Sequence, residues 1–517
     1  MQSFLSNSRS SGVLAHITSL PGPYGIGDTG ESSYHFIDFL QRCGQTYWQI
    51  LPTTPTNLHF DSSPYMSTSA FAGSPLLISP QALVEDGLLA ASDLARAPHF
   101  SPYLTDYHQV TVFKKKLLAR SFNSFSTAYD RHYLDFIRRT PWLSDYALFM
   151  SLKEVYAEHP WYRWPEALAR REPAALAEAE DRYRERIDYY LFEQYMFFGQ
   201  WSKMKKYAHL KDIRLIGDIP IYVGLDSCDV WAHQDIFELD PKTFKPIRIA
   251  GVPPDYFSKT GQRWGNPLYR WNDKDLSVSD KLLKWWIERF RSVFHMVDVS
   301  RVDHFRGFES YWAVPEEEET ALNGTWVQGP GETFFNNIYK ELGRLNIIAE
   351  DLGEITPEVL KLRDILGFPG MKVLQFAFDG NPENTFLPCN FEHANCVVYT
   401  GTHDNDTTLG WFLSDKVSDS QRNQIKLFAN RHMHDKSPIN DDLIYLAFSS
   451  TAALAIIPLQ DLLGFGSDCR MNTPGVPKGN WRWRCHDKYL TDKLADKIKK
   501  ITARFNRIGT VKRNHKG

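Results

Sequence analysis

Short apolar runs recur along the chain, and each gives way to a segment of polar or glycine-rich residues. Eight of them have the length and β-branched content of buried strands: 12–18, 47–51, 213–223, 295–302, 346–349, 370–378, 395–400 and 452–458. Amphipathic helical spacing follows the first run, at 32–42. Buried strands that alternate with helices are typical of a parallel sheet. The pattern therefore predicts an α/β fold, a (β/α)8 barrel in which helices surround a closed sheet.

Two long segments interrupt this alternation. Residues 53–207 follow the second strand and are mainly helical, so we interpret them as an insertion. Residues 224–275 follow the third strand as a long loop without clear secondary structure, and this loop carries Trp264. Loops of such length within a compact domain are usually functional. We expect a single catalytic barrel over 1–517, in which the 224–275 segment covers a substrate.

Charged residues gather where the fourth apolar run ends. Asp303 and His304 follow the run, and Arg301 lies two residues before the aspartate. Residues two apart in a strand project from the same face, so Arg301 and Asp303 should lie side by side. An arginine beside a carboxylate favours its ionised form. At the C-terminal end of a barrel strand this arrangement suits a nucleophile or an electrostatic stabiliser, although a strand end that turns into solvent also carries charges.

Carboxylates also follow other strands: Asp218, Glu350, Asp379 and Asp404. In a barrel, the C-terminal ends of successive strands converge on one face. Glu350 comes directly after an apolar run, and partial burial there would raise its pKa and suit a proton donor. One protonated and one ionised carboxyl group are the minimum for cleaving a glycosidic bond. Asp404 lies in a polar turn from which it could bind sugar hydroxyls.

Composition narrows the class of ligand. The formal net charge is −3 and basic residues are not concentrated in a patch, which argues against nucleic acid and anionic membrane as partners. The chain contains 15 Trp, 24 Tyr and 33 Phe, and aromatic faces stack on sugar rings, so a carbohydrate ligand is favoured. Its six cysteines form no CxxC pair, which predicts reduced thiols in a cytoplasmic protein. The sequence contains no run of eighteen consecutive apolar residues, so it predicts no membrane span.

Two other chemistries have weaker support in the sequence. Residues 25–30 match the GxGxxG pattern of dinucleotide-binding folds, but two prolines and several other residues separate them from the preceding strand. The next strand is not followed by an acidic residue placed for a ribose. A metal site is disfavoured because the chain has neither an EF-hand loop nor an HExxH sequence. We expect neither a cofactor nor a metal.

Segments spread over almost the whole chain have a recognisable form. They include SPYMSTSAFAGSPLLI at 63–78, GVPPDYFSKTGQRWGNPLYRW at 251–271, SRVDHFRGF at 300–308, IIAEDLGEITPEV at 347–359 and YTGTHDNDTTLGW at 399–411. Together they resemble the amylomaltases, or 4-α-glucanotransferases, of the α-amylase clan. The family usually carries Ile where this chain has Val302, a conservative difference.

The resemblance implies roles at the matching positions. Asp303 would be the nucleophile, Glu350 the general acid/base, and Asp404 a third carboxylate that holds sugar hydroxyls and distorts the ring. The residues that would line the reacting subsite or contact the glucan are Tyr65, Asp218, Trp264, Arg301, His304 and His403. Asp379 and Asn472 are further candidates for substrate binding, and the alternative for either is a residue that caps a loop.

The activity implied by the resemblance is the transfer of α-1,4-glucan segments. Malto-oligosaccharides would serve as donors, and the 4-hydroxyl of glucose or of another malto-oligosaccharide would be the acceptor. The reaction would retain configuration through a covalent glycosyl-aspartate. A hydrolase with the same carboxylates, and a glucan-binding protein without activity, are the alternatives. The residues themselves do not distinguish transfer from hydrolysis, and they leave the oligomeric state open.

Overall fold

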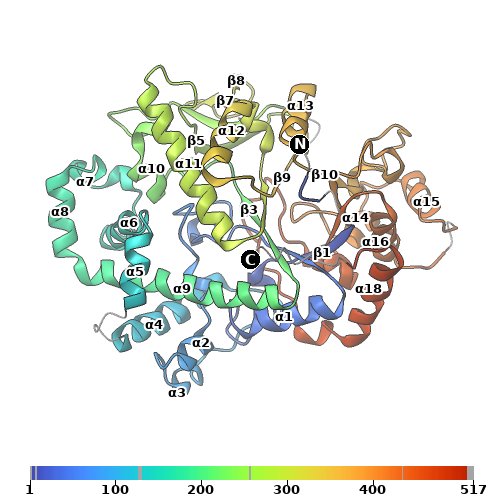
Figure 1. The fold of residues 1–517 in the computed structure, drawn as a ribbon, viewed down its shortest axis with the longest axis horizontal. Helices are drawn as coiled ribbons and strands as arrows, with labels where there is room; N and C mark the ends of the chain where they lie inside the picture. Colours follow the sequence, from blue (N-terminus) through green and yellow to red (C-terminus); the bar gives the residue numbers. More distant parts are fainter. Residues whose placement is uncertain (1–2, 6–8, 126–130, 255–257, 433–434, 509–517) are drawn as a thin grey trace.

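The computed structural model describes residues 3–5, 9–125, 131–254, 258–432 and 435–508. Its central sheet has eight parallel strands in the hydrogen-bonded order β10-β11-β12-β1-β2-β3-β6-β9. The Ala349 N–H in β9 donates to the carbonyl of Pro369, directly before β10, at 3.0 Å, which brings the two ends of the sheet together. The predicted (β/α)8 barrel is confirmed, and Figure 1 shows its strands at the centre of the molecule with helices around them.

The barrel strands are short, and each overlaps one of the eight predicted runs. They are β1 (Ser10–Leu14), β2 (Tyr47–Gln49), β3 (Arg214–Ile219), β6 (Val299–Val302), β9 (Ile347–Ala349), β10 (Gly370–Val373), β11 (Cys396–Tyr399) and β12 (Leu454–Pro458). Most of their residues are buried, because a barrel strand faces the packed interior on one side and the helices on the other.

Helices of the barrel wall lie between or after these strands. They are α1 (Glu31–Arg42), α11 (Leu276–Met296), α12 (Gly331–Leu342), α13 (Pro357–Leu366), α14 (Thr408–Leu413), α15 (Asp419–Phe428), α16 (Ile439–Ser449), α17 (Leu459–Leu463) and α18 (Asp492–Arg504). In α1 the apolar residues Phe36, Ile37 and Leu40 are buried while Glu31 and Arg42 lie at its first and last turns. These charges complement the helix dipole.

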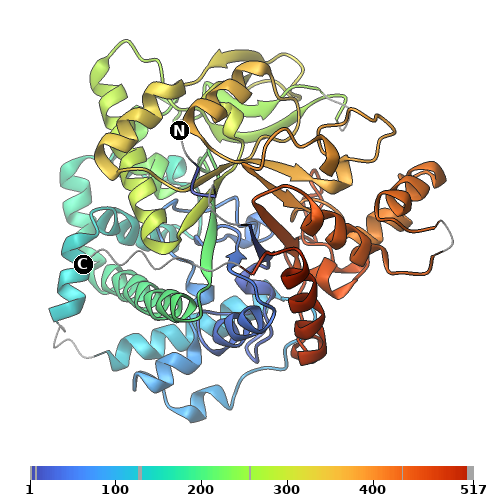
Figure 2. The same cartoon turned by 45° about the vertical axis from the view of Figure 1, so that its right-hand side comes forward.

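The segment between β2 and β3 consists mainly of helices. They are α2 (Pro80–Glu85), α3 (Ala91–Leu94), α4 (Tyr107–Ser124), α5 (Arg131–Arg139), α6 (Leu143–Val155), α7 (Glu166–Ala169), α8 (Pro173–Arg182) and α9 (Arg184–Leu210). Figures 1 and 2 show the long helix α9 returning from this region toward the barrel, where it packs against α1 and β3.

The 224–275 segment differs from the expected irregular loop. After α10 (Cys228–Ala232) it forms β4 (Arg248–Val252) and β5 (Gln262–Pro267), while residues 255–257 lie outside the described residues. These strands join β7 (Ser310–Pro315) and β8 (Thr325–Gln328) in an antiparallel sheet of order β5-β4-β7-β8. β4 pairs with β5 and β7 pairs with β8, each its neighbour along the chain. The pairing of β4 with β7, in which Gly251 lies opposite Trp312, joins these two local pairs across a long stretch of sequence.

The predicted runs are longer than the observed strands, and two examples show apolar runs that extend into helical structure. The run at 295–302 begins inside helix α11, and the Val297 N–H still donates to the Val293 carbonyl at 2.9 Å, so the strand starts only at Val299. The run at 370–378 leaves the strand after Val373 and continues as a 3-10 turn, Leu374–Phe376. A continuous apolar run cannot distinguish a buried helix end from a strand.

The glycine-rich loop at 25–30 is packed against the protein itself. Ile26 is fully buried, and a Cβ added at Gly27 would lie 2.0 Å from the carbonyl oxygen of Ile17. The glycine at this position thus permits a close approach of two backbone segments.

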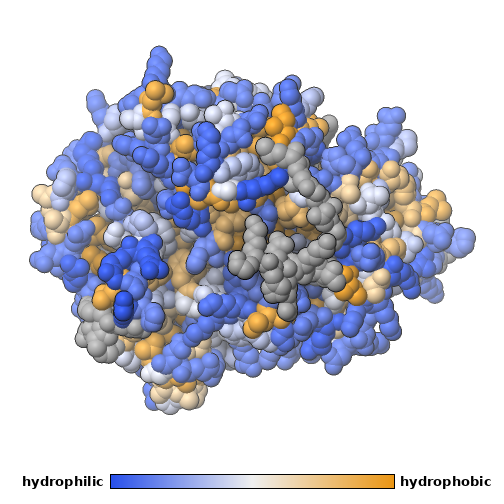
Figure 3. Space-filling view, viewed as in Figure 1, coloured by the Kyte–Doolittle hydropathy of each residue, from blue (hydrophilic) through white to orange (hydrophobic). Residues whose placement is uncertain are grey.

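The surface is mostly hydrophilic on the face seen in Figure 3, with scattered apolar residues. Within the described part of the chain, no helix combines the length and the apolar content needed to cross a bilayer.

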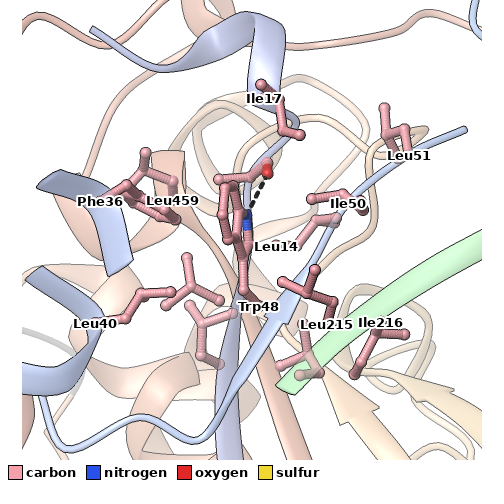
Figure 4. Packing of buried hydrophobic residues seen from close by; sticks show 14 of the residues in the cluster. Leu14, Ile17, Phe36, Leu40, Trp48, Ile50, Leu51, Leu215, Ile216 and Leu459 are labelled. Atoms are coloured by element: carbon pink, nitrogen blue, oxygen red, sulfur yellow. Dashed lines mark hydrogen bonds between the residues drawn. The ribbon is translucent and has the colours of Figure 1, made fainter. Parts of the chain in front are cut away.

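Trp48 in β2 anchors the packing between the barrel interior and α1 (Figure 4). Its indole is fully buried among Leu14, Phe36 and Leu215, and its Nε1–H donates to the carbonyl of Ala15 at 2.8 Å. The ring fills core volume, and its one polar atom has a partner.

Trp48→Ala is expected to lower the free energy of unfolding by about 3–5 kcal/mol, because the ring leaves a cavity. Trp48→Phe should cost less, since it keeps most of the volume but leaves the Ala15 carbonyl without its donor. Denaturant titration measures both, with Leu210→Ala as a control at a side chain that is 80 % exposed. Equal stability of Trp48→Ala and the control would contradict this role.

Candidate active site

The candidate acids lie at the C-terminal ends of neighbouring barrel strands. In the parallel register Asp218 of β3 is opposite Arg301 of β6, and Val302 of β6 is opposite Ala349 of β9. The ladder continues one residue further, because the Glu350 N–H donates to the Val302 carbonyl at 3.1 Å. Asp303 and Glu350 therefore leave adjacent strands at the same level of the barrel.

Arg301 joins two of these carboxylates. Its Nη1 donates to Oδ2 of Asp218 at 2.7 Å, and its Nη2 lies 2.7 Å from Oδ1 of Asp303. The arginine side chain is 5 % exposed and that of Asp303 is 29 % exposed. The Arg301–Asp303 contact follows the spacing seen in the sequence. It leaves Asp303 as a charge-paired carboxylate that is still partly exposed, and a nucleophile requires both properties.

Glu350 is held by backbone amides. Its Oε2 accepts a hydrogen bond from the His304 N–H at 2.7 Å, and its Oε1 accepts one from the Leu352 N–H at 2.9 Å. Burial raises the pKa of Glu350 to about 7, with a further contribution from Asp303, while Arg301 and the two amides act in the opposite direction. A carboxyl group with this pKa can both give and take a proton near neutral pH.

Tyr65, from the segment after β2, lies between Asp218 and His403. Its hydroxyl donates to Oδ2 of Asp218 at 2.7 Å, and its oxygen is 2.9 Å from Nε2 of His403. The two rings stack with centroids 5.3 Å apart. Burial raises the pKa of Asp218 to about 7, and burial also lowers the pKa of His403. Because the Tyr65 hydroxyl donates its hydrogen to Asp218, the contact with His403 requires a hydrogen on Nε2 of the imidazole.

Asp404 is fixed from the loop that follows β12. Its Oδ1 accepts a hydrogen bond from Nδ2 of Asn472 at 2.6 Å, and its backbone carbonyl accepts one from Nη2 of Arg470 at 2.6 Å. Its Oδ2 lies 3.4 Å from Nε2 of His403. Although Asp404 is 44 % exposed, it is held by His403, which follows β11, and by Arg470 and Asn472, which follow β12.

His304 and Trp264 pack edge to face, with ring centroids 4.8 Å apart. His304 adopts the left-handed conformation (φ 50°, ψ 49°), which points its backbone N–H at Glu350. Burial lowers its pKa to about 4, so the imidazole is neutral. The contact places Trp264, from the 224–275 segment, beside the strand end that carries Asp303.

The expected site residues thus fall into one connected group with one exception. Asp379 is exposed, and its Oδ1 accepts a hydrogen bond from the N–H of Asn381 in its own loop at 2.9 Å. A role for Asp379 in substrate binding stays a prediction.

Three neighbours of the group were not identified from the sequence. Arg470 fixes Asp404 as described above. Trp481 lies 5.8 Å from the ring of Tyr65 and 5.9 Å from that of His403. His16, whose Nδ1 accepts a hydrogen bond from the Leu51 N–H at 3.3 Å, lines a cavity together with His403 and Arg470. They come from distant parts of the chain, and only the folded barrel brings strands β1, β11 and β12 together.

A closed barrel with paired carboxylates at the C-terminal ends of its strands defines a (β/α)8-barrel enzyme. A family model described as 4-alpha-glucanotransferase matches residues 15–491, and the chain belongs to that family.

Individual relatives match over nearly their full length. The 4-alpha-glucanotransferase of Synechocystis sp. is 48 % identical over 96 % of this chain and 98 % of its own, and that of Thermus thermophilus is 45 % identical over 92 % and 94 %. The solved amylomaltase of Streptococcus agalactiae, in complex with acarbose, superposes with a TM-score of 0.91 at 38 % identity, covering 96 % of this chain and 99 % of that one.

The raised pKa of Glu350 predicts a pH-dependent stability. An ordinary unfolded glutamate has a pKa near 4.5 and the folded one about 7, so the folded protein holds the extra proton and loses stability as pH rises through this interval. Glu350→Gln removes this titration. The decrease in thermal midpoint between pH 5 and pH 8 should therefore be smaller in the variant than in the wild type, and equal decreases would contradict the assignment.

Proposed function

We propose that this protein transfers α-1,4-glucan segments from malto-oligosaccharide donors to the 4-hydroxyl of glucose or of another malto-oligosaccharide. One observation carries the proposal: the Arg301-paired Asp303 and the amide-held Glu350 project from adjacent strands β6 and β9. One carboxyl group is ion-paired and the other is buried and bound by amides, and two carboxyl groups in different environments suit retaining glycoside chemistry. The acarbose complex of the Streptococcus agalactiae amylomaltase supports a carbohydrate ligand.

In the first step Asp303 attacks the anomeric carbon of the donor. The glycosidic bond breaks, the leaving oxygen takes the proton from Glu350, and a glycosyl ester forms on Asp303. The buried, amide-held position of Glu350 supports its role as the acid, since its pKa of about 7 leaves it protonated in much of the enzyme at neutral pH. Arg301 supports the role of Asp303 by holding one of its oxygens.

In the second step the now ionised Glu350 takes the proton of the acceptor 4-hydroxyl. The acceptor oxygen attacks the anomeric carbon, the ester bond breaks, and Asp303 is released as a carboxylate. Asp404, held by Asn472, is placed to hold sugar hydroxyls of the reacting ring.

Transfer requires that a sugar hydroxyl competes with water for the intermediate. Tyr65, which contacts Asp218, and Trp264, which contacts His304, provide aromatic surface for an acceptor ring. Positioning of this kind is worth several kcal/mol over a free water. We propose that the 224–275 segment covers the cleft, which the contact of Trp264 with His304 supports. A cytoplasmic location stays a prediction.

The function is tested with maltotriose as sole substrate. The wild-type protein should produce glucose together with oligosaccharides longer than the donor, with little gain in total reducing ends, because each transfer breaks one glycosidic bond and makes another. Chromatography and a reducing-end assay follow both quantities. A steady rise in reducing ends without longer products would identify a hydrolase instead.

The two carboxylate roles are tested with a donor that has an acidic leaving group. Glu350→Gln should still accept the sugar of α-glucosyl fluoride on Asp303, because fluoride leaves without a proton, and the adduct should persist since the general base is missing. Asp303→Asn should form no adduct. Intact-protein mass spectrometry detects the added mass, with Glu358→Gln on the exposed face of α13 as a control. An adduct on Asp303→Asn but never on Glu350→Gln would invert the roles.

A further inference from the structure

The segments that carry Asp303 and Glu350 are bound to each other beyond the barrel ladder. The Phe305 N–H donates to the Glu350 carbonyl at 3.2 Å, and the His304 N–H donates to its carboxylate at 2.7 Å. Phe305 begins the 3-10 turn Phe305–Phe308, which directly follows the strand end of β6. The position of the Glu350 carboxylate therefore depends on where this turn lies.

Arg306, the second residue of that turn, extends the connection. Its Nη1 donates to the backbone carbonyl of Glu354, four residues after Glu350. The arginine is 6 % exposed although it touches neither candidate acid. It thus joins the loop after β9 to the turn after β6 at a point further from the barrel than the amide contacts.

The guanidinium of Arg306 is itself held by an aromatic surface. Its Cζ lies 4.0 Å from the ring centroid of Trp326 in β8. That indole packs at 65° on Trp312 of β7, with centroids 5.2 Å apart, and Trp312 donates its Nε1–H to the Ala321 carbonyl at 2.9 Å. A planar guanidinium stacked in this way loses little freedom when it binds a carbonyl, and an ammonium cannot reproduce the stacking.

We infer that Arg306 is a positioning residue for the general acid/base: held by Trp326, it clamps the loop of Glu350 against the turn after Asp303. The inference rests on the proposed glucanotransferase function. It assigns the small antiparallel sheet a part in catalysis, because β7 and β8 supply the surface on which the clamp is built.

Loss of the clamp has a defined electrostatic consequence. The charged groups that face Glu350 are Arg301 and Asp303 at the end of β6, and those that face Arg306 are Glu354 and Glu309. Burial is the largest cause of the raised pKa of Glu350. A loosened loop admits water, lowers that pKa, and leaves less of the acid form at a given pH. The alkaline limb of the pH–rate profile should then move to lower pH.

The experiment compares two donors in Arg306→Met, Arg306→Lys and Trp326→Ala. Cleavage of maltotriose needs the proton of Glu350, whereas the first release of fluoride from α-glucosyl fluoride does not. Arg306→Met should lower kcat/KM for maltotriose by about tenfold or more, since a well-placed general acid contributes about 10²–10⁴-fold. The first-turnover fluoride release should change much less. Arg306→Lys should lie between wild type and Arg306→Met, and Trp326→Ala should deviate in the same direction.

Arg422→Met is the matched control. Arg422 also donates to backbone carbonyls, those of Phe412 and Ser414, and lies over the Phe412 ring at 5.8 Å, but it belongs to α15. It should leave the donor ratio and the pH profile unchanged.

Equal losses with both donors, together with an unchanged alkaline limb, would overturn the inference and leave Arg306 a structural residue. If Arg306→Met does not fold, Arg306→Lys and Trp326→Ala decide by the same donor ratio. Failure of the proposed function would be seen separately, because the wild-type protein would then make no oligosaccharide longer than maltotriose.

Discussion

The ion-paired centre formed by Asp218, Arg301 and Asp303 is the interaction on which the site depends. The arginine lies in the barrel interior, with an aspartate at 2.7 Å on each side. Removing one partner of a buried ion pair costs about 3–5 kcal/mol, because the remaining charge loses its compensation. Each member therefore fixes the others. Tyr65 extends the group to His403, and His403 extends it to Asp404, so that one network spans strands β3, β6 and β11.

This network explains why the charged groups have separate tasks. The Asp218 side chain has no exposed surface, and its Oδ2 accepts hydrogen bonds from both Arg301 and Tyr65. Asp303, in contrast, remains partly accessible. Glu350 lies beside the network, where burial raises its pKa although two backbone amides donate to its carboxyl oxygens. Two carboxyl groups on adjacent strands are thus held by different partners, Asp303 by a guanidinium and Glu350 by backbone amides.

Local patterns in the sequence were enough to predict the barrel and the contact between Arg301 and Asp303. Apolar runs located the eight strands, and the two-residue spacing of Arg301 and Asp303 predicted their contact. The failures of the sequence prediction have a common cause in long-range pairing. The pairing of β4 with β7 joins segments more than forty residues apart, and Arg470, Trp481 and His16 reach the site only after the barrel closes. The first residues of the run 295–302 belong to helix α11, and apolar content alone does not show where the helix ends and the strand begins.

The pairing of β1 with β12 has a consequence for synthesis of the protein. In the parallel register Ser10 of β1 lies opposite Leu454 of β12. Strand β1 can therefore pair with β12 only when most of the chain has been made. At translation rates of about 5–20 residues per second, the wait is about 20–90 seconds. During that time the edge of β1 that will face β12 is open to pairing with other strands. A barrel closed through its first and last strands therefore exposes its newly made N-terminal half to misassembly, and places that half within reach of chaperones, until translation is nearly complete.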